Sequence, residues 1–248
     1  MERRPVGKEL LDLPGEASRD EIEGNLRDIS RANRWLGGTS VVLCHLIHLI
    51  DVKPYRRPVR ILDLATGLAD IPVTLVRWAR AHRLPVEIIA VDRNPIVVDL
   101  ARENVRPYPE IHVRERNILS LPFADGEFDF VTASQVIHHL ENEDVVSLLK
   151  TANRLASGGI VVSDIRRRPL CTLLANIGTL VVENRLSRHD GIISFRNAFT
   201  PGEIEELAVE AGLPCWRVYT HGPCRLALVS DKRTTECLKN PRPINQPT

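Results

Sequence analysis

The sequence has no long apolar run, no Cys-x-x-Cys pair and no excess of charge of one sign. The most apolar early stretch, residues 41–50, contains His45 and His48 and is far shorter than the roughly 20 residues of a membrane-spanning helix. Residues 1–13 are charged and lack the apolar core of a secretory signal. We therefore predict a cytoplasmic protein without a membrane span.

The charges are almost balanced, with 33 Lys and Arg against 32 Asp and Glu and a net charge of +1. Such a balance provides no broad positive field for a nucleic acid or an anionic membrane. The total therefore predicts no nucleic-acid partner.

The cysteines are few and scattered: Cys44, Cys171, Cys215, Cys224 and Cys237. Their odd number and irregular spacing argue against a disulfide framework and against a zinc site. We expect free thiols in a reducing cytosol and no metal ligands.

Alternating strand and helix patterns begin near Pro58. Before it, Ser18 and Glu21 have the spacing of a capping box, which predicts a helix over residues 19–36, followed by a second helix over 40–50. Further helices are expected to begin at Asp70, after Asn94 and near Asp144. A buried strand is expected at 59–64, with further strands at 86–91, 128–133 and 159–163 and a weak one at 111–114.

The C-terminal third is expected to add an insert, a helix and two strands. Residues 170–182 are largely apolar and predict a helix within an insert at 169–199. Thr200 and Glu203 form another capping box, before a predicted antiparallel pair at 216–220 and 225–230. Alternating strands and helices predict an α/β fold, a Rossmann-like doubly wound sheet of seven mostly parallel strands with an antiparallel last strand.

We predict three parts along the chain: a helical lid at 1–57, a catalytic domain at 58–230 with a substrate-capping insert at 169–199, and a polar tail at 231–248. In such folds ligands bind beyond the carboxyl ends of the strands. The residues expected at those ends are Asp63, Ala65, Gly67, Ala69, Asp70, Asp92, Asn117, Ile118, Ser134, His138 and His139.

The residues at the strand ends suit a nucleoside ligand. Gly67 lets the backbone pass close to a ligand, and an acid such as Asp92 after the second strand can accept both hydroxyls of a ribose. The Asn117 amide can hydrogen-bond an adenine edge, and the anionic Asp63 favours a bound ammonium group.

Three stretches resemble the class I S-adenosylmethionine-dependent methyltransferases, in particular the small-molecule branch with the ubiquinone and menaquinone biosynthesis methyltransferases. They are ILDLATGLAD at 61–70, AVDRNP at 90–95 and LPFADGEFDFVTASQVIHHL at 121–140. The resemblance covers about residues 60–230. It implies S-adenosylmethionine as the cofactor.

Carried over by position, the resemblance assigns a part of the cofactor to each strand end. The methionine portion would lie at Asp63, Ala65, Gly67 and the Ser134 backbone, the ribose at Asp92, and the adenine at Arg93, Asn117 and Ile118. The sequence departs from the family pattern where Ala65 and Ala69 stand in place of glycines and Asn117 in place of aspartate.

The methyl acceptor is predicted to be a small apolar or aromatic molecule of phenolic, polyketide or quinone type, because the insert is apolar. A phenol or enol must lose a proton, and a histidine suits that role near neutral pH. His139 is the first candidate for the general base and His138 the second. His189 and Asp190, in an expected loop over the pocket, are outside candidates.

Other interpretations remain open. A nicotinamide-dependent oxidoreductase would normally carry G-x-G-x-x-G, whereas residues 65–70 contain one glycine. A fold that binds the cofactor without transferring a methyl group is a further alternative. Singly, Asp92 could cap the next helix, Asn117 could be a turn residue, and His138 and His139 could be packed structural histidines.

Overall fold

The computed structural model describes residues 7–13, 15, 17–50, 57–178 and 182–234. The predicted tail beyond residue 234 and residues 179–181 of the predicted insert lie outside the described residues, as do residues 51–56 before the catalytic domain.

A single mixed sheet has the strand order β3-β2-β1-β4-β5-β7-β6. The five strands β1 to β5 are parallel, and β7 is antiparallel to both β5 and β6, so the predicted Rossmann-like sheet is confirmed. The strands are β1 (Val59–Leu64), β2 (Val86–Asp92), β3 (Ile111–Glu115), β4 (Phe128–Ser134), β5 (Ala156–Ile165), β6 (Trp216–His221) and β7 (Arg225–Asp231). Central strands such as β1 are buried on both faces, which explains their continuous apolar sequence.

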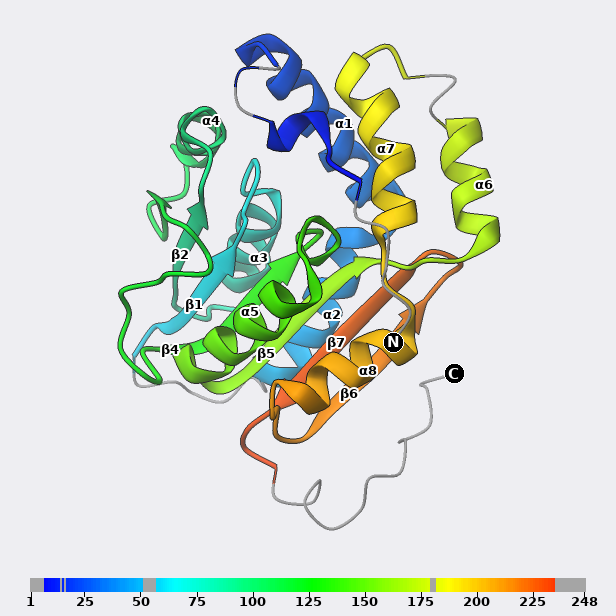
Figure 1. Ribbon diagram of the computed structural model, residues 1–248. Coiled ribbons are helices and arrows are strands. Elements are labelled where there is room, and N and C mark those ends of the chain that lie inside the picture. The colour runs from blue at the N-terminus through cyan, green and yellow to red at the C-terminus, as the bar shows by residue number, and fades with distance from the viewer. Residues whose placement is uncertain (1–6, 14, 16, 51–56, 179–181, 235–248) are drawn as a thin grey trace.

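Helices cover both faces of the sheet (Figure 1). The helices α2 (Gly38–Ile50), α3 (Asp70–Ala81) and α4 (Pro95–Val105) share one apolar core with the sheet. The helices α5 (Asn142–Leu155) and α8 (Pro201–Glu210) share a second core on the opposite face. The layered arrangement therefore leaves the ends of the strands as the place for a ligand.

Apart from η2 (Ile137–His139), a short turn after β4, the remaining helical elements form a cap at one end of the sheet: η1 (Leu10–Asp12), α1 (Arg19–Trp35), α6 (Pro169–Gly178) and α7 (Arg185–Asn197) (Figure 1). Ile22 and Leu26 of α1 and Leu186 of α7 pack with Val97 and Leu100 of α4, which fastens the cap to the domain. The segment 1–57, which was predicted to be one helical lid, contains two parts: α1 belongs to the cap, whereas α2 packs on the sheet.

Several helices begin at the capping residues that the sequence predicted. Ser18 with Glu21, and Thr200 with Glu203, each form both hydrogen bonds of a capping box. Asn94 accepts a hydrogen bond from the Ile96 N–H, and Pro95 begins α4. These predictions are confirmed because the signals depend only on residues close in sequence.

The prediction of a loop at His189 and Asp190 is wrong. His189 and Asp190 lie in α7 rather than in a loop; Asn184 starts this helix by accepting the Leu186 and Ser187 N–H groups. The sequence of α7 is largely polar and has no continuous apolar stripe, so its periodicity does not indicate a helix.

A disulfide joins Cys171 to Cys224, contrary to the expectation of free thiols. The cysteines are 53 residues apart in sequence. They meet because the antiparallel pairing of β7 with β5 brings the loop before β7 next to the start of α6. Sequence spacing alone carries no sign of this approach.

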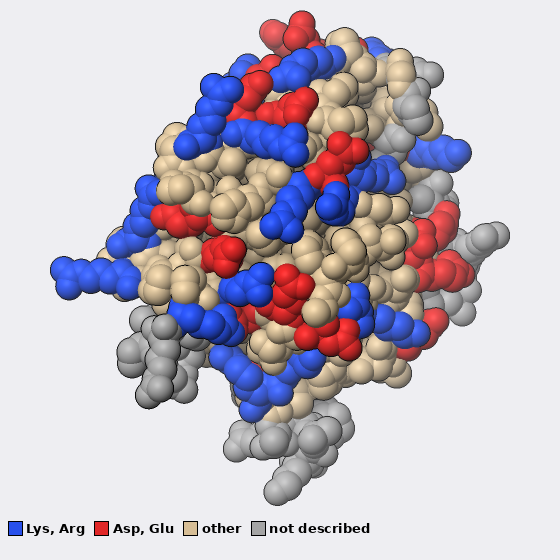
Figure 2. All heavy atoms as spheres, turned by 90° about the vertical axis from the view of Figure 1, so that its left-hand side faces the viewer, with Lys and Arg blue, Asp and Glu red and all other residues tan. Residues whose placement is uncertain are grey.

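The surface gives no continuous field of one sign on the side that carries α4 and β3. Figure 2 shows basic and acidic side chains interspersed there. Ion pairs join Arg80 to Glu110 at 2.7 Å and Arg102 to Asp99 at 3.3 Å. Among the described residues, no helix is long and apolar enough to cross a membrane.

Candidate active site

A cavity lies beyond the carboxyl ends of β1 to β4, between the strand-end loops and α1. All of the residues predicted to bind the cofactor line it: Asp63, Ala65, Gly67, Asp92, Arg93, Asn117, Ile118 and Ser134. Side chains of the cap complete the wall, including Leu11, Leu26, Ile29 and Ser30. None of the described residues of the insert 169–199 is among those that line it.

The loop after β1 places three residues in the left-handed region: Ala65 at φ 53°, Gly67 at 55° and Ala69 at 57°. This conformation is natural for glycine, whereas an alanine in it is disfavoured by about 1–2 kcal/mol. The two alanines therefore keep the backbone shape that glycines would give, at the expense of local strain.

The Asp92 carboxylate connects two strand-end loops. Oδ2 accepts the Gly67 N–H at 3.2 Å and Oδ1 accepts the Asn94 N–H at 3.1 Å. Because Asn94 caps α4, the alternative that Asp92 is the cap of this helix is wrong. Burial raises the pKa of Asp92.

Asp63 is buried beneath the cavity, where its two carboxylate oxygens accept the hydroxyl protons of Thr66 and Thr132, each at 2.7 Å. Burial raises the pKa of Asp63 to about 6. Asp70, which accepts the Ser30 hydroxyl at 3.3 Å, also lines the cavity, and burial raises its pKa. A cation entering the cavity would offset the loss of hydration that these acids undergo.

The site fits S-adenosylmethionine by its chemistry. Asp63, Asp70 and Asp92 face one cavity, and the cofactor carries a sulfonium and an ammonium charge. Ser134, on the same wall, has a buried hydroxyl oxygen with no hydrogen-bond partner among the described residues. A buried polar atom of this kind calls for a partner that a bound polar ligand can provide.

Asn117 is exposed, and its side-chain oxygen accepts the Leu119 N–H at 3.0 Å. Asn117 is therefore a turn residue, which is the simpler of the two alternatives for it. The same side chain lies on the cavity wall, so the turn and a contact with a ligand are compatible.

The two adjacent histidines differ in position. His139 is half-buried and lines the cavity. His138 is buried, is not among the lining residues, and its Nδ1 lies 2.7 Å from Oδ1 of Asp164. Asp164 also accepts the backbone N–H of His138 at 3.2 Å. Of the two candidates for the general base, only His139 is therefore in reach of a substrate in this cavity.

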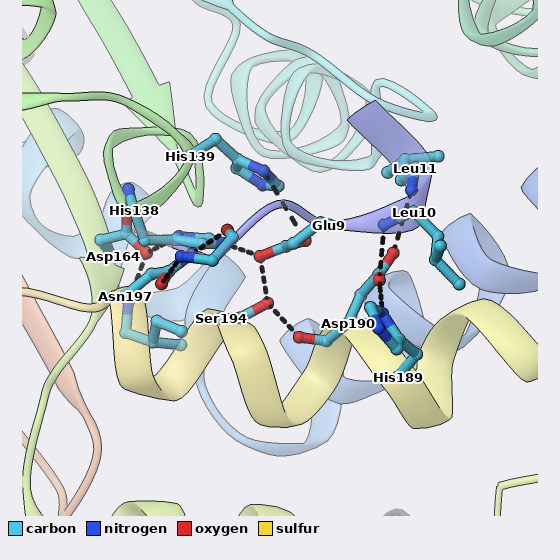
Figure 3. Close-up of polar contacts among 12 residues, drawn as sticks. Glu9, Leu10, Leu11, His138, His139, Asp164, His189, Asp190, Ser194 and Asn197 are labelled. Atoms are coloured by element: carbon cyan, nitrogen blue, oxygen red, sulfur yellow. Dashed lines mark hydrogen bonds and ion pairs between the residues drawn. The ribbon is translucent and has the colours of Figure 1, made fainter. Parts of the chain in front are cut away.

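Glu9 is a site residue that sequence reasoning missed. It is buried, and its carboxylate lies between His138 and His139, with the Ser194 hydroxyl donating to Oε1 at 2.7 Å (Figure 3). Burial raises the pKa of Glu9. No pattern around residue 9 indicates this role, whereas Asp164, near the end of β5, could have been found by the strand-end rule used for the other strands.

The segment that carries Glu9 lies along α7 (Figure 3). The Asp190 carboxylate accepts the N–H groups of Leu10 and Leu11 at 2.8 and 3.1 Å. Gly7 donates its N–H to the Asn197 amide oxygen at 2.9 Å. Asp190 therefore holds this segment in place, a role different from the catalytic one considered for it.

Comparison with known proteins finds a family model and relatives that match part of the chain. Residues 62–163 match the family model described as methyltransferase domain. The chain is 31% identical to the demethylmenaquinone methyltransferase of Lysinibacillus sphaericus over 112 residues. The aligned segment covers 45% of this chain and 44% of that protein. Residues 62–163 are therefore similar to a methyltransferase domain.

Solved structures show the same fold. A S-adenosylmethionine-dependent methyltransferase from Aquifex aeolicus matches 86% of this chain and 98% of its own, with a TM-score of 0.60 and 15% identity. Human N-acetylserotonin methyltransferase, in complex with S-adenosylmethionine, matches 90% of this chain and 59% of its own, with a TM-score of 0.63 and 19% identity.

The prediction of a methyltransferase domain is thereby confirmed over residues 62–163, and the solved structures confirm the predicted fold. The chain spans less than half the length of the first curated relatives that it matches. The methyltransferase match ends at residue 163, so it leaves out the cap elements α1, α6 and α7, which lie on either side of it in sequence.

Proposed function

We propose that the protein transfers a methyl group from S-adenosylmethionine to a hydroxyl group of a small apolar or aromatic acceptor, of phenolic, polyketide or quinone type. The observation that carries the proposal is one cavity with two kinds of wall. Carboxylates and strand-end loops form one part, and Leu11, Leu26 and Ile29 of the cap contribute apolar surface to the same cavity. The relative named a demethylmenaquinone methyltransferase agrees with an acceptor of quinone type.

In this proposal the strand-end residues divide the cofactor among them. Asp92 accepts the ribose hydroxyls, and Asp63 balances the ammonium charge. Asn117 and the Ile118 backbone read the adenine edge, with Arg93 beside it. The Ser134 backbone assists at the methionine end, and its unpaired hydroxyl offers a further hydrogen bond.

S-adenosylmethionine supplies the methyl group already activated on a sulfonium, so the chemical demand on the protein is modest. The cavity aligns the acceptor oxygen with the methyl carbon, and alignment is worth up to about 7–11 kcal/mol of the barrier. As the new oxygen–carbon bond forms, the carbon–sulfur bond breaks and its electron pair stays on sulfur. His139 takes the hydroxyl proton, and the cap excludes water from the reacting atoms.

A transfer assay tests the proposal. The full chain is incubated with S-adenosylmethionine and a panel of phenols, hydroxyquinones and enolic polyketides, and products are followed by mass spectrometry. We expect one class to gain a single methyl group, with an equal amount of S-adenosylhomocysteine formed. The Gly67→Val variant places a branched side chain at a left-handed position on the cavity wall and serves as the control that should lose transfer. Transfer only to nitrogen compounds or polar acceptors would contradict the proposal.

A further inference from the structure

Glu9, His138 and His139 bring three potential metal ligands together beside the cavity (Figure 3). One atom from each residue, a carboxylate oxygen or a ring nitrogen, lies within 4.8 Å of the other two. Glu9 and His138 are buried, while His139 also lines the cavity. The cluster therefore has a protected side and a side that faces the proposed acceptor.

The separations within the cluster are those of ligands around an ion. His138 Nε2 lies 3.7 Å from Glu9 Oε1, and His139 Nδ1 lies 3.6 Å from Glu9 Oε2. Both exceed the 2.7–3.2 Å of an N–H···O hydrogen bond. Two ligands bound tetrahedrally to zinc at about 2.1 Å stand about 3.4 Å apart. Small side-chain adjustments would bring all three atoms onto one ion.

Outer hydrogen bonds orient two of these ligands. His138 Nδ1 pairs with Asp164 Oδ1 at 2.7 Å, which leaves Nε2 as the nitrogen on the Glu9 side. The Ser194 hydroxyl donates to Glu9 Oε1 at 2.7 Å. A carboxylate behind a histidine and a hydrogen bond to a ligating carboxylate are the usual supports of protein metal sites.

We propose that Glu9, His138 and His139 bind a divalent transition-metal ion, zinc being the ion that two imidazoles and a carboxylate suit well. Three protein ligands leave a coordination position open, as in catalytic zinc sites. We expect the acceptor oxygen to fill this open position. In this respect the inference rests on the proposed function.

The ion would change how the acceptor loses its proton. Coordination to the ion would lower the pKa of the acceptor hydroxyl, so that the acceptor would give its proton to solvent as it enters, before the cap excludes water. The resulting oxyanion would then attack the methyl carbon. In the metal-bound protein His139 is then a ligand and not the base. The sequence predicted no metal site because Glu9 lies far from the histidines along the chain.

Calorimetric titration of the chelator-treated full chain with zinc tests the site, with visible absorption of bound cobalt as a second readout. A Cys44→Ser background removes an exposed thiol that would bind zinc on its own. We expect one zinc per chain. Asp164→Asn, which weakens the support of His138, should lower the affinity about 10- to 100-fold, and Glu9→Gln and His139→Asn should lower it further. His112→Asn changes an exposed histidine outside the cluster and should leave it unaltered.

The proposal fails if the parent chain binds no stoichiometric zinc, or if Glu9→Gln and His139→Asn bind it as the parent does. Circular dichroism checks folding; if Glu9→Gln does not fold, His139→Asn, at the half-buried cavity wall, decides the outcome. S-adenosylhomocysteine affinity is measured in parallel. Zinc binding without methyl transfer to any hydroxylated acceptor would count against the proposed function and leave the metal site in place.

Discussion

The Asp92 carboxylate accepts the backbone N–H of Gly67 at 3.2 Å, so the loops after β1 and β2 are joined at the wall of the cavity. One side chain thereby shapes the glycine turn and presents oxygens to the ligand. Cofactor binding and loop conformation should consequently respond together when Asp92 is changed.

Replacement of Asp92 by alanine should weaken S-adenosylhomocysteine binding about 10- to 150-fold, because a hydrogen bond to a charged group is worth about 1.5–3 kcal/mol. Titration calorimetry measures the change. Asp99→Ala, at an exposed residue of α4 paired with Arg102, is the matched control and should bind normally. Equal affinity in the parent and Asp92→Ala would remove Asp92 from the site.

Ala65→Gly and Ala69→Gly should each stabilise the fold by about 1 kcal/mol, since glycine relieves the left-handed strain but has greater freedom in the unfolded chain. Urea unfolding of each variant gives the free energy. Ala81→Gly, in the last turn of α3, should instead destabilise by up to about 1 kcal/mol. A loss of stability in all three variants would contradict the left-handed conformation of the loop.

The sequence was informative where the signal was local. The starts of three helices followed from the capping residues Ser18, Asn94 and Thr200, and the strands followed from their apolar runs. The rule that ligands bind beyond the strand ends identified residues that line the cavity. The sequence was uninformative where distant segments meet. Neither the contact of Glu9 with His138 nor the bond between Cys171 and Cys224 follows from any spacing, because folding alone brings these residues together.

The affinity for S-adenosylhomocysteine should rise as the pH rises through about 6 and level off above it. Burial raises the pKa of Asp63 to about 6, and the ammonium group of the ligand prefers the ionised carboxylate. The stability of the protein without ligand should depend on pH in the opposite direction. Between about pH 4 and 6, Asp63 keeps a proton in the folded protein that it has lost in the unfolded chain. The contribution of Asp63 to the free energy of unfolding therefore falls as the pH rises.

Calorimetry from pH 5 to 8 separates Asp63 from its neighbours Asp70 and Asp92, whose pKa values burial also raises. Asp63→Asn should flatten the part of the profile near pH 6. A parent profile that keeps its shape in Asp63→Asn would assign the titration to another carboxyl.

His139→Asn should lower the rate of methyl transfer by about 10²-fold or more, the usual contribution of a positioned proton acceptor. S-adenosylhomocysteine affinity should remain close to that of the parent, because the residue is assigned to the acceptor. Transfer kinetics are measured with excess cofactor, and His112→Asn, which changes an exposed histidine, is the control. A full rate in His139→Asn would show that His139 serves neither as the base nor as a required ligand.

The central claim is that the cavity beyond β1 and β2 binds S-adenosylmethionine. Titration of the full chain with S-adenosylhomocysteine, and separately with NAD, tests it most directly, with Gly67→Val titrated in the same way. The account predicts one S-adenosylhomocysteine per chain, no binding of NAD, and loss of S-adenosylhomocysteine binding in folded Gly67→Val. Binding of NAD in place of S-adenosylhomocysteine, or undiminished S-adenosylhomocysteine binding by Gly67→Val, would contradict it.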